Sequence, residues 1–270
     1  MWGETVVNAR YRRESEFHDK AFSEGTRHKA SKFYSIRESS MAAYIRAVEA
    51  HCTQKRVLEY GCGPYTYSSL MMARGASITG IDLSPVAISQ YVRQANRQSE
   101  RPVNGCVMNA EALGFAAHSF DLVCGIGIVH HLDLRRSFSE ISRALKPGGY
   151  AVFLEPLGHN PLISLYRKLT PSMRTVDEHP LLTQDIKLAE EFFENVECQF
   201  FHLSSLGAVP LQNLCCFNSV VKFLDALDQT IFRLMPYFRR CAWATVLVLS
   251  RPKHSPVPAG WAPDISAVGE

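Results

Sequence analysis

The apolar run VLEY contains the carboxylate of Glu59 and is followed by two closely spaced glycines, a pattern that suits a ligand-binding loop. Gly61 and Gly63 lie just after that run. Glycines at this spacing let the backbone pass close to a ligand, and a helix after them would offer it free N–H groups. A dinucleotide fingerprint would place a third glycine where Thr66 stands. Glu59 would repel a pyrophosphate and Pro64 removes one backbone donor, so the loop favours a nucleoside bearing a cationic amino acid group.

Two later polar positions fit the same ligand. Asp82 ends the second apolar run, 21 residues after Gly61. A carboxylate there can accept the hydroxyls of a ribose, and the alternative is that Asp82 only caps the following helix. Asn109 ends the third run and precedes Ala110 and Glu111. The Asn109 amide can pair with an exocyclic amine and the Ala110 N–H with a ring nitrogen, which amounts to adenine recognition.

Alternating strands and helices must position these residues. Short apolar runs predict strands at 56–61, 77–84, 103–110, 120–129 and 150–156. Helical patterns lie between them at 66–75, 84–98 and 134–149, and further strands are expected within 189–206 and 242–250. This order predicts an α/β fold with a doubly wound, mostly parallel, seven-stranded sheet. Ligands bind such sheets at the carboxyl ends of the strands, where the polar residues above occur.

The rest of the chain is expected to cover this core. Residues 1–50 are predicted to form an N-terminal helical cover, and residues 51–251 the main domain. Lid insertions are expected at about 156–182 and 206–240, and residues 252–270 are predicted to be a disordered tail.

The helical segment 217–234 has two interpretations. Its apolar face, predicted to contain Val220, Val221, Leu224, Leu227 and Ile231, favours a wall over the pocket of an apolar substrate. The alternative is a helix that binds a membrane surface weakly. The cations that support it are Lys222, Arg233, Arg239 and Arg240.

Five segments at the strand ends resemble, in order and in spacing, the class I S-adenosylmethionine-dependent methyltransferases. They are VLEYGCG, GIDLSP, NAEALGF…SFDLV, GIVHHL and RALKPGG, between Val57 and Glu155. The chain looks most like the small-molecule branch, methyltransferase type 11, which includes quinone-biosynthesis enzymes. The resemblance implies a Rossmann-like fold, S-adenosylmethionine as the cofactor, and transfer of a methyl group to a small, fairly apolar molecule at O, N or C.

The resemblance also implies a set of cofactor-binding residues. The glycine loop would pass under the methionine part, the first carboxylate would hold its ammonium, and the later residues would bind the ribose and adenine. They are Glu59, Gly61, Cys62, Gly63, Asp82, Leu83, Asn109, Ala110, Glu111, Gly125 and Ile126. Two positions depart from the family pattern, which usually has glycine at Tyr65 and often aspartate at Asn109. Tyr65 would narrow the pocket or shift the start of the helix.

Methyl transfer gains from orientation of the nucleophile and, for a hydroxyl acceptor, from a general base. His130 and His131 follow the fourth strand beside the expected methyl position, and one of them is expected to face the site. Tyr34 would fold over the cofactor, or else be a core tyrosine. Substrate contacts are expected from the polar segment after the fifth strand, at Glu155, His159, Asn160, Arg174 and His179. The spacing of its histidines gives no known metal-ligand pattern, so no metal is expected.

Composition narrows the class of protein. Of 270 residues, 46% are hydrophobic and 20% charged, with a net charge of +3, which is ordinary for a globular enzyme and too weak to argue for nucleic acid. No leader or spanning segment is apparent, and the eight scattered cysteines include no C-x-x-C pair, so a cytoplasmic protein with reduced thiols is expected. The base-modifying branch shows an Asn/Asp-Pro-Pro-aromatic motif where this chain has GIGIVHHL, so no nucleic-acid partner is expected.

Two other functions stay open. An NAD-type oxidoreductase is disfavoured by Thr66, Pro64 and Glu59. A catalytically silent protein that binds S-adenosylmethionine is favoured only by Tyr65 in place of glycine.

Overall fold

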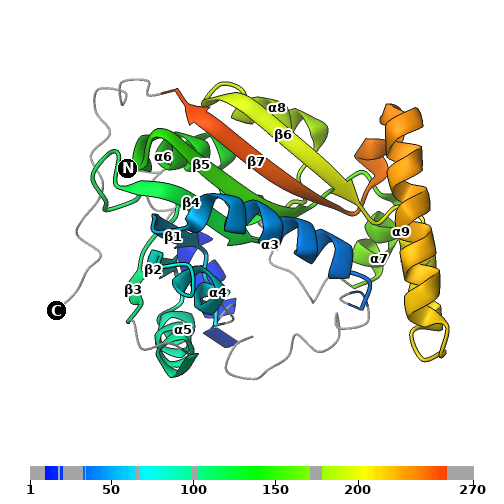
Figure 1. Cartoon of the computed structure of the whole chain (residues 1–270), viewed down its shortest axis with the longest axis horizontal. Coiled ribbons are helices and arrows are strands. Elements are labelled where there is room, and N and C mark those ends of the chain that lie inside the picture. The colour runs from blue at the N-terminus through cyan, green and yellow to red at the C-terminus, as the bar shows by residue number, and fades with distance from the viewer. Residues whose placement is uncertain are drawn as a thin grey trace.

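Within the part of the chain that the structure describes, seven strands form one sheet in the order β3-β2-β1-β4-β5-β7-β6 (Figure 1). The computed structural model describes residues 10–17, 19–20, 33, 35–64, 67–98, 102–170 and 178–253. The strands are β1 Arg56–Tyr60, β2 Ser77–Asp82, β3 Asn104–Val107, β4 Phe120–Ile126, β5 Leu145–Pro156, β6 Phe193–Phe201 and β7 Ala244–Pro252. Strands β1 to β5 pair in parallel, and β7 runs antiparallel between β5 and β6. The predicted seven-stranded, mostly parallel sheet is confirmed.

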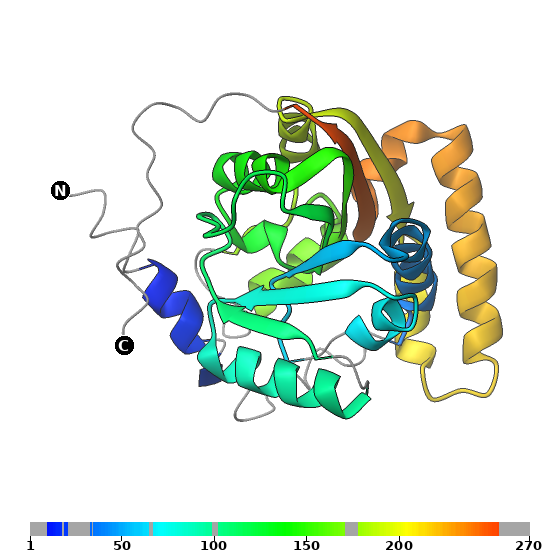
Figure 2. The ribbon, with the colours of Figure 1, turned by 60° about the vertical axis from the view of Figure 1, so that its left-hand side comes forward.

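Helices cover both faces of the sheet (Figures 1 and 2). They are α3 Glu38–Cys52, α4 Ser68–Met72, α5 Pro85–Gln98, α6 Leu134–Ala144, α7 Pro161–Leu169, α8 Thr183–Ala189 and α9 Phe217–Leu234. Short 3-10 helices are η2 Val129–His131, η4 Ser205–Leu211 and η5 Pro236–Cys241. One apolar cluster joins α6 and α8 to the sheet, and another joins α3, α4 and α5 to it. The sheet therefore buries apolar side chains on both faces, as a doubly wound fold requires.

Local signals explain most helix ends. The Ser84 hydroxyl accepts a hydrogen bond from the Ala87 N–H at 2.9 Å and so caps α5, as predicted. Helix α6 ends at Ala144, so the prediction that it continues to Pro147 is wrong. Leu145 is fully buried and pairs with Phe120 as the first residue of β5. Pairing in the sheet therefore overrides the helical pattern of this segment.

A third apolar cluster lies beyond the sheet. It joins Ile36, α7, η4 and α9, with Trp243 packed against it. The residues of α9 that are buried are Phe217, Val221, Asp228 and Phe232, whereas Leu227 is 40% exposed. The predicted buried face of α9 was therefore wrong for Leu227. The domain limits and the lid role of the two insertions stay predictions, and residues 254–270 of the predicted tail lie outside the described residues.

Candidate active site

The glycine loop lies between the ends of β1 and β4. Gly61 and Gly63 adopt positive φ angles of 63° and 55°, which favour glycine. A Cβ atom on Gly61 would lie 2.5 Å from Cγ1 of Ile128, so this residue must be glycine for the chain after β4 to approach. A Cβ atom on Gly63 would meet no heavy atom of the described residues within 4 Å. Among these residues, the loop is therefore closed on the Gly61 side and open beside Gly63.

Glu59 is held from inside the protein. Its side chain is 8% exposed, and its Oε2 atom accepts hydrogen bonds from the Ser68 hydroxyl and, at 2.6 Å, from the Tyr91 hydroxyl. Burial, together with the nearby charge of Glu59, raises the pKa of Tyr91. Tyr91 therefore stays a hydrogen-bond donor that fixes the Glu59 carboxylate. Its predicted contact with the cofactor ammonium stays a prediction.

Asp82 ties the glycine loop to the end of β2. Its Oδ2 atom accepts a hydrogen bond from the Gly63 N–H at 3.0 Å, and its Oδ1 atom accepts one from the Ser84 N–H at 2.9 Å. The alternative that Asp82 caps α5 is not what the structure shows, because the Ser84 hydroxyl does so. The Asp82 carboxylate instead sets the position of Gly63.

The segment after β3 is bound to the rest of the domain. The Asn109 side-chain oxygen accepts from the Glu111 N–H at 2.9 Å, and the Ala110 carbonyl accepts from the Tyr60 hydroxyl. Glu111 is 2% exposed, and its carboxylate accepts from Arg10, Tyr11 and the Asp133 N–H at 2.7, 2.9 and 2.8 Å. Glu111 thus anchors the N-terminal helical residues 10–17, which we call the cover helix, and the start of α6.

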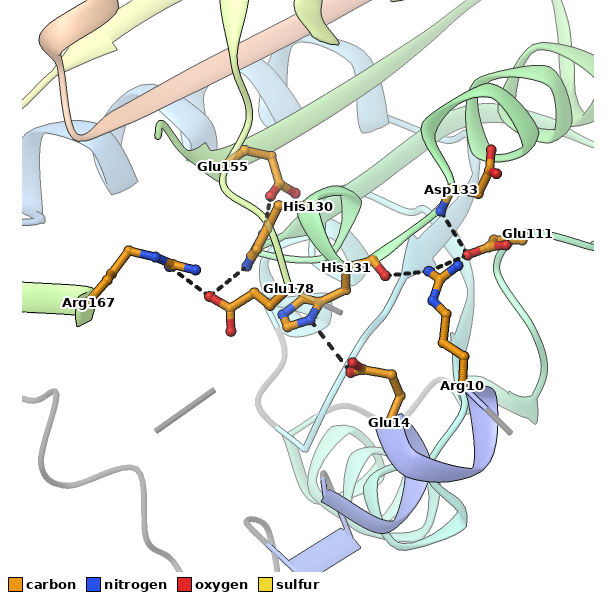
Figure 3. A network of polar contacts seen from close by, with 9 residues as sticks. All are labelled: Arg10, Glu14, Glu111, His130, His131, Asp133, Glu155, Arg167 and Glu178. Carbon is orange, nitrogen blue, oxygen red and sulfur yellow. Dashed lines mark hydrogen bonds and ion pairs between the residues drawn. The ribbon is translucent and has the colours of Figure 1, made fainter. Parts of the chain in front are cut away.

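The cover helix contacts two of the predicted cofactor-binding residues, Glu111 and Leu83, and Figure 3 shows its contact with Glu111. Besides binding Glu111, Arg10 donates to the His131 carbonyl at 2.6 Å. Ser15 donates to the Leu83 carbonyl at 3.2 Å. The cover helix therefore bridges the ends of β2, β3 and β4, while the cover role predicted for residues 1–50 as a whole stays a prediction.

His130 is fixed in a buried polar network (Figure 3). Its Nδ1 atom lies 2.7 Å from Oε2 of Glu155, which is 1% exposed. Oε1 of Glu155 accepts the N–H groups of Ile128 and Val129 at 3.0 and 2.9 Å. Glu155 was predicted to contact substrate. In the structure it orients His130 and holds the loop after β4.

Burial lowers the pKa of His130, and the neighbouring His131 adds to that shift, while Glu155 and Glu178 oppose it. The imidazole is therefore neutral at neutral pH. The 2.7 Å contact fits an Nδ1–H group that donates to Oε2 of Glu155, so we assign the proton of the neutral ring to Nδ1. The lone pair then lies on Nε2, and this nitrogen is able to accept a proton.

On its other side His130 meets Glu178. Its Nε2 atom lies 3.9 Å from Oε1 of Glu178, which accepts a 2.7 Å hydrogen bond from Arg167 of α7. Burial alone would raise the pKa of Glu178, but His130, His131 and Arg167 together lower it. His131 faces the cover helix, with Nδ1 3.6 Å from Oε2 of Glu14. Of the two histidines, His130 thus lies between Glu155 and the polar segment after β5.

The residues predicted to contact substrate have different surroundings in the structure. Asn160 caps α7 through the Ile163 N–H and donates to the Cys241 carbonyl at 2.7 Å, so it holds the backbone. His159 and His179 are exposed, and the His179 N–H donates to the His130 carbonyl at 3.1 Å. Tyr34, Arg174 and Tyr65 lie outside the described residues.

Sequence reasoning missed the contributions of Arg10, Glu14 and Arg167, because nothing in their local patterns distinguishes them from exposed helix charges. It also found no metal ligands by spacing, whereas His130, His131 and Glu178 bring ligand atoms within 4.8 Å of one another. Arg167 already neutralises Glu178 there, so a cation would have to compete with it.

Comparison with known proteins shows which domain family the chain is similar to. Residues 58–153 match the family model described as a methyltransferase domain. A ubiquinone biosynthesis O-methyltransferase of Nitrosomonas europaea is 33% identical over 125 residues, which are 46% of this chain and 52% of that protein. A tRNA U34 carboxymethyltransferase of Ectopseudomonas mendocina is 29% identical over 189 residues, 66% of this chain and 57% of that protein. The chain spans about half the length of the curated relatives it matches.

The fold recurs in solved structures. Geranyl diphosphate C-methyltransferase from Streptomyces coelicolor A3(2), in complex with Mg²⁺, geranyl diphosphate and S-adenosyl-L-homocysteine, aligns with a TM-score of 0.55 and 16% identity. The match covers 84% of this chain and 85% of that chain, and at this identity it shows the fold alone. Residues 58–153 therefore match the methyltransferase domain family that the motifs of this chain resemble.

Proposed function

We propose that this chain transfers a methyl group from S-adenosylmethionine to a hydroxyl of a small, fairly apolar molecule. Support for the reaction class comes from the family match over residues 58–153. A relative named for O-methylation in ubiquinone biosynthesis supports a small-molecule acceptor. The observation that carries the choice of a hydroxyl is the 2.7 Å contact of His130 Nδ1 with Glu155, which favours the tautomer whose Nε2 atom can accept a proton.

The cofactor would lie across the carboxyl ends of β1, β2 and β4. The space beside Gly63 supports passage of the methionine part. The Asp82 carboxylate accepts the Gly63 and Ser84 N–H groups at the end of β2, and it is proposed to accept the ribose hydroxyls there. Glu59 is proposed to hold the ammonium. S-adenosylmethionine would supply the electrophilic methyl group.

His130 is proposed to act as the general base. The acceptor hydroxyl would give its proton to Nε2 of His130 while its oxygen forms a bond to the methyl carbon. The cofactor would supply this carbon and would leave as a neutral thioether, so the positive charge would end on the His130 imidazolium. Glu155 keeps the other ring nitrogen protonated and stabilises the imidazolium that forms.

Calorimetry with S-adenosylmethionine and, separately, with NAD tests cofactor choice. Binding of the former alone is expected, and Asp82→Ala is expected to weaken it by about tenfold or more, the value of one lost charged hydrogen bond. Absence of heat with S-adenosylmethionine would refute the proposal.

Release of S-adenosylhomocysteine over a panel of small phenols and catechols tests the reaction. His130→Gln is expected to keep cofactor affinity and to lose about 100-fold or more in rate. Equal rates for the variant and the wild type would show that His130 is not the general base. They would leave the cofactor assignment unaffected.

A further inference from the structure

Large apolar side chains are concentrated on the outer surface of α9 and η5. Of the twelve that are exposed among the described residues, six lie between Phe223 and Phe238. Phe223, Leu234 and Tyr237 are 68, 73 and 65% exposed. Single exposed apolar residues are common on protein surfaces, but a concentration of this kind marks an interaction site.

Helical geometry places the exposed residues of α9 on one face. At about 100° per residue, Phe223, Leu227 and Leu234 fall within roughly 40° of one another. Phe217, Val221 and Phe232, which pack against the body of the protein, lie on the opposite side. Helix α9 thus has two apolar faces, and only one of them is covered by described parts of the chain.

The acidic side chains of α9 face the body of the protein, whereas its basic side chains face solvent. Asp228 is fully buried and accepts hydrogen bonds from the Leu203 and Ser204 N–H groups at 2.9 and 2.7 Å. Asp225 is also turned inward, with Oδ1 3.5 Å from Nδ1 of His202. The charged side chains of α9 and η5 classed as exposed are all cations, namely Lys222, Arg233, Arg239 and Arg240.

We propose that α9 and η5 form a docking surface for a bilayer that contains anionic lipids. The apolar face would enter the headgroup boundary, with the cations at its edge and Tyr237 and Phe238 at the level where aromatic rings prefer to lie. A second copy of the chain fits less well, because two such faces would bring cations together. This inference goes beyond the proposed methyl transfer and does not depend on it.

Co-sedimentation of the full chain with vesicles tests the surface. One set contains phosphatidylcholine alone, and the other contains roughly three parts of it to one of phosphatidylglycerol. Binding to the anionic vesicles only, weakening as salt rises, is expected. Lys222→Gln with Arg233→Gln should weaken that binding about thirty-fold, and Phe223→Ser with Leu234→Ser about tenfold or more.

Matched controls lie near the far edge of the sheet, where α5 contacts β3 (Figures 1 and 2). Arg93→Gln with Arg97→Gln on α5 removes the same charge, and Val107→Ser on β3 removes an apolar side chain that is 50% exposed. Both controls should bind vesicles as the wild type does. All variants change exposed residues, so unchanged melting temperatures will show that they fold.

Three results would overturn the proposal. The first is no binding to anionic vesicles at low salt. The second is equal loss of binding in the α9 variants and the α5 control, which would indicate a nonspecific charge effect. The third is concentration-dependent dimerisation, measured by sedimentation velocity, that Phe223→Ser with Leu234→Ser abolishes. That result would assign this face to a second copy of the chain.

Discussion

Replacement of Glu155 by glutamine should change which nitrogen of His130 carries the proton. The carboxylate accepts three hydrogen bonds, two from backbone N–H groups and one from Nδ1 of His130. Glutamine keeps one acceptor oxygen and replaces the other by an NH₂ donor. The amide must therefore turn its NH₂ group either toward the backbone pair or toward the imidazole.

The number of lost hydrogen bonds decides between the two orientations. An NH₂ group facing the N–H groups of Ile128 and Val129 would leave two buried donors unsatisfied, at about 1–3 kcal/mol each. An NH₂ group facing His130 conflicts with one donor only, and His130 relieves that conflict by moving its proton to Nε2. We therefore expect the second orientation, a loss of about 1–2 kcal/mol in the free energy of unfolding, and a methyl-transfer rate reduced about 10² to 10⁴-fold.

Nitrogen-15 NMR of histidine side chains measures the tautomer without a known acceptor. The signals of His130 are assigned by their loss in His130→Gln. Spectra at a pH of about 8 keep the imidazole neutral. The wild type should show a protonated Nδ1 and a bare Nε2, and Glu155→Gln should show the reverse.

Glu178→Gln is the matched control. Its Oε1 atom is 3.9 Å from Nε2, which is beyond hydrogen-bond distance, so the tautomer should stay that of the wild type. A wild type with the proton on Nε2, or a Glu155→Gln variant with an unchanged tautomer, would refute the reasoning.

Further predictions concern the loop, the pH dependence and the cover helix. Gly61→Ala should lower the free energy of unfolding by about 2–4 kcal/mol, because the new methyl group would both clash with Ile128 and strain a backbone with positive φ. Gly63→Ala carries only the backbone strain and should lower it by about 1 kcal/mol. Equal losses in urea titrations would contradict the packing argument. Because the pKa of His130 is lowered by burial, its contribution to stability is complete above the ordinary value of 6.5 and is lost as the pH falls through the lowered pKa. His130→Gln should flatten that part of the stability curve, and an unchanged slope would be inconsistent with a neutral buried His130. Arg10→Ala removes two hydrogen bonds of the cover helix, so hydrogen exchange of residues 10–17 should accelerate about 10- to 100-fold; unchanged protection would show that other contacts hold the helix.

Much of the fold was predictable because its signals are local. The apolar runs gave the strands, Ser84 and Gly75 marked helix ends, and segment 217–234 is helical over its predicted length. Local signals failed where pairing decided the outcome. Leu145 continues the helical pattern, yet it pairs with Phe120 and begins β5. The outward orientation of Leu227 was equally unpredictable, because the helical period does not reveal which apolar face finds a partner.

By itself the sequence determined the order of elements, the glycine loop and the acidic and histidine residues at the strand ends, since each depends on neighbours along the chain. Only the tertiary structure decided what those side chains do. In the folded chain, Glu155 contacts His130, Asn160 caps the start of α7, and Glu111 binds the cover helix. The physical reason is that a buried carboxylate or amide must find donors wherever the fold brings them. These donors come from segments far apart in the sequence, which no local pattern specifies.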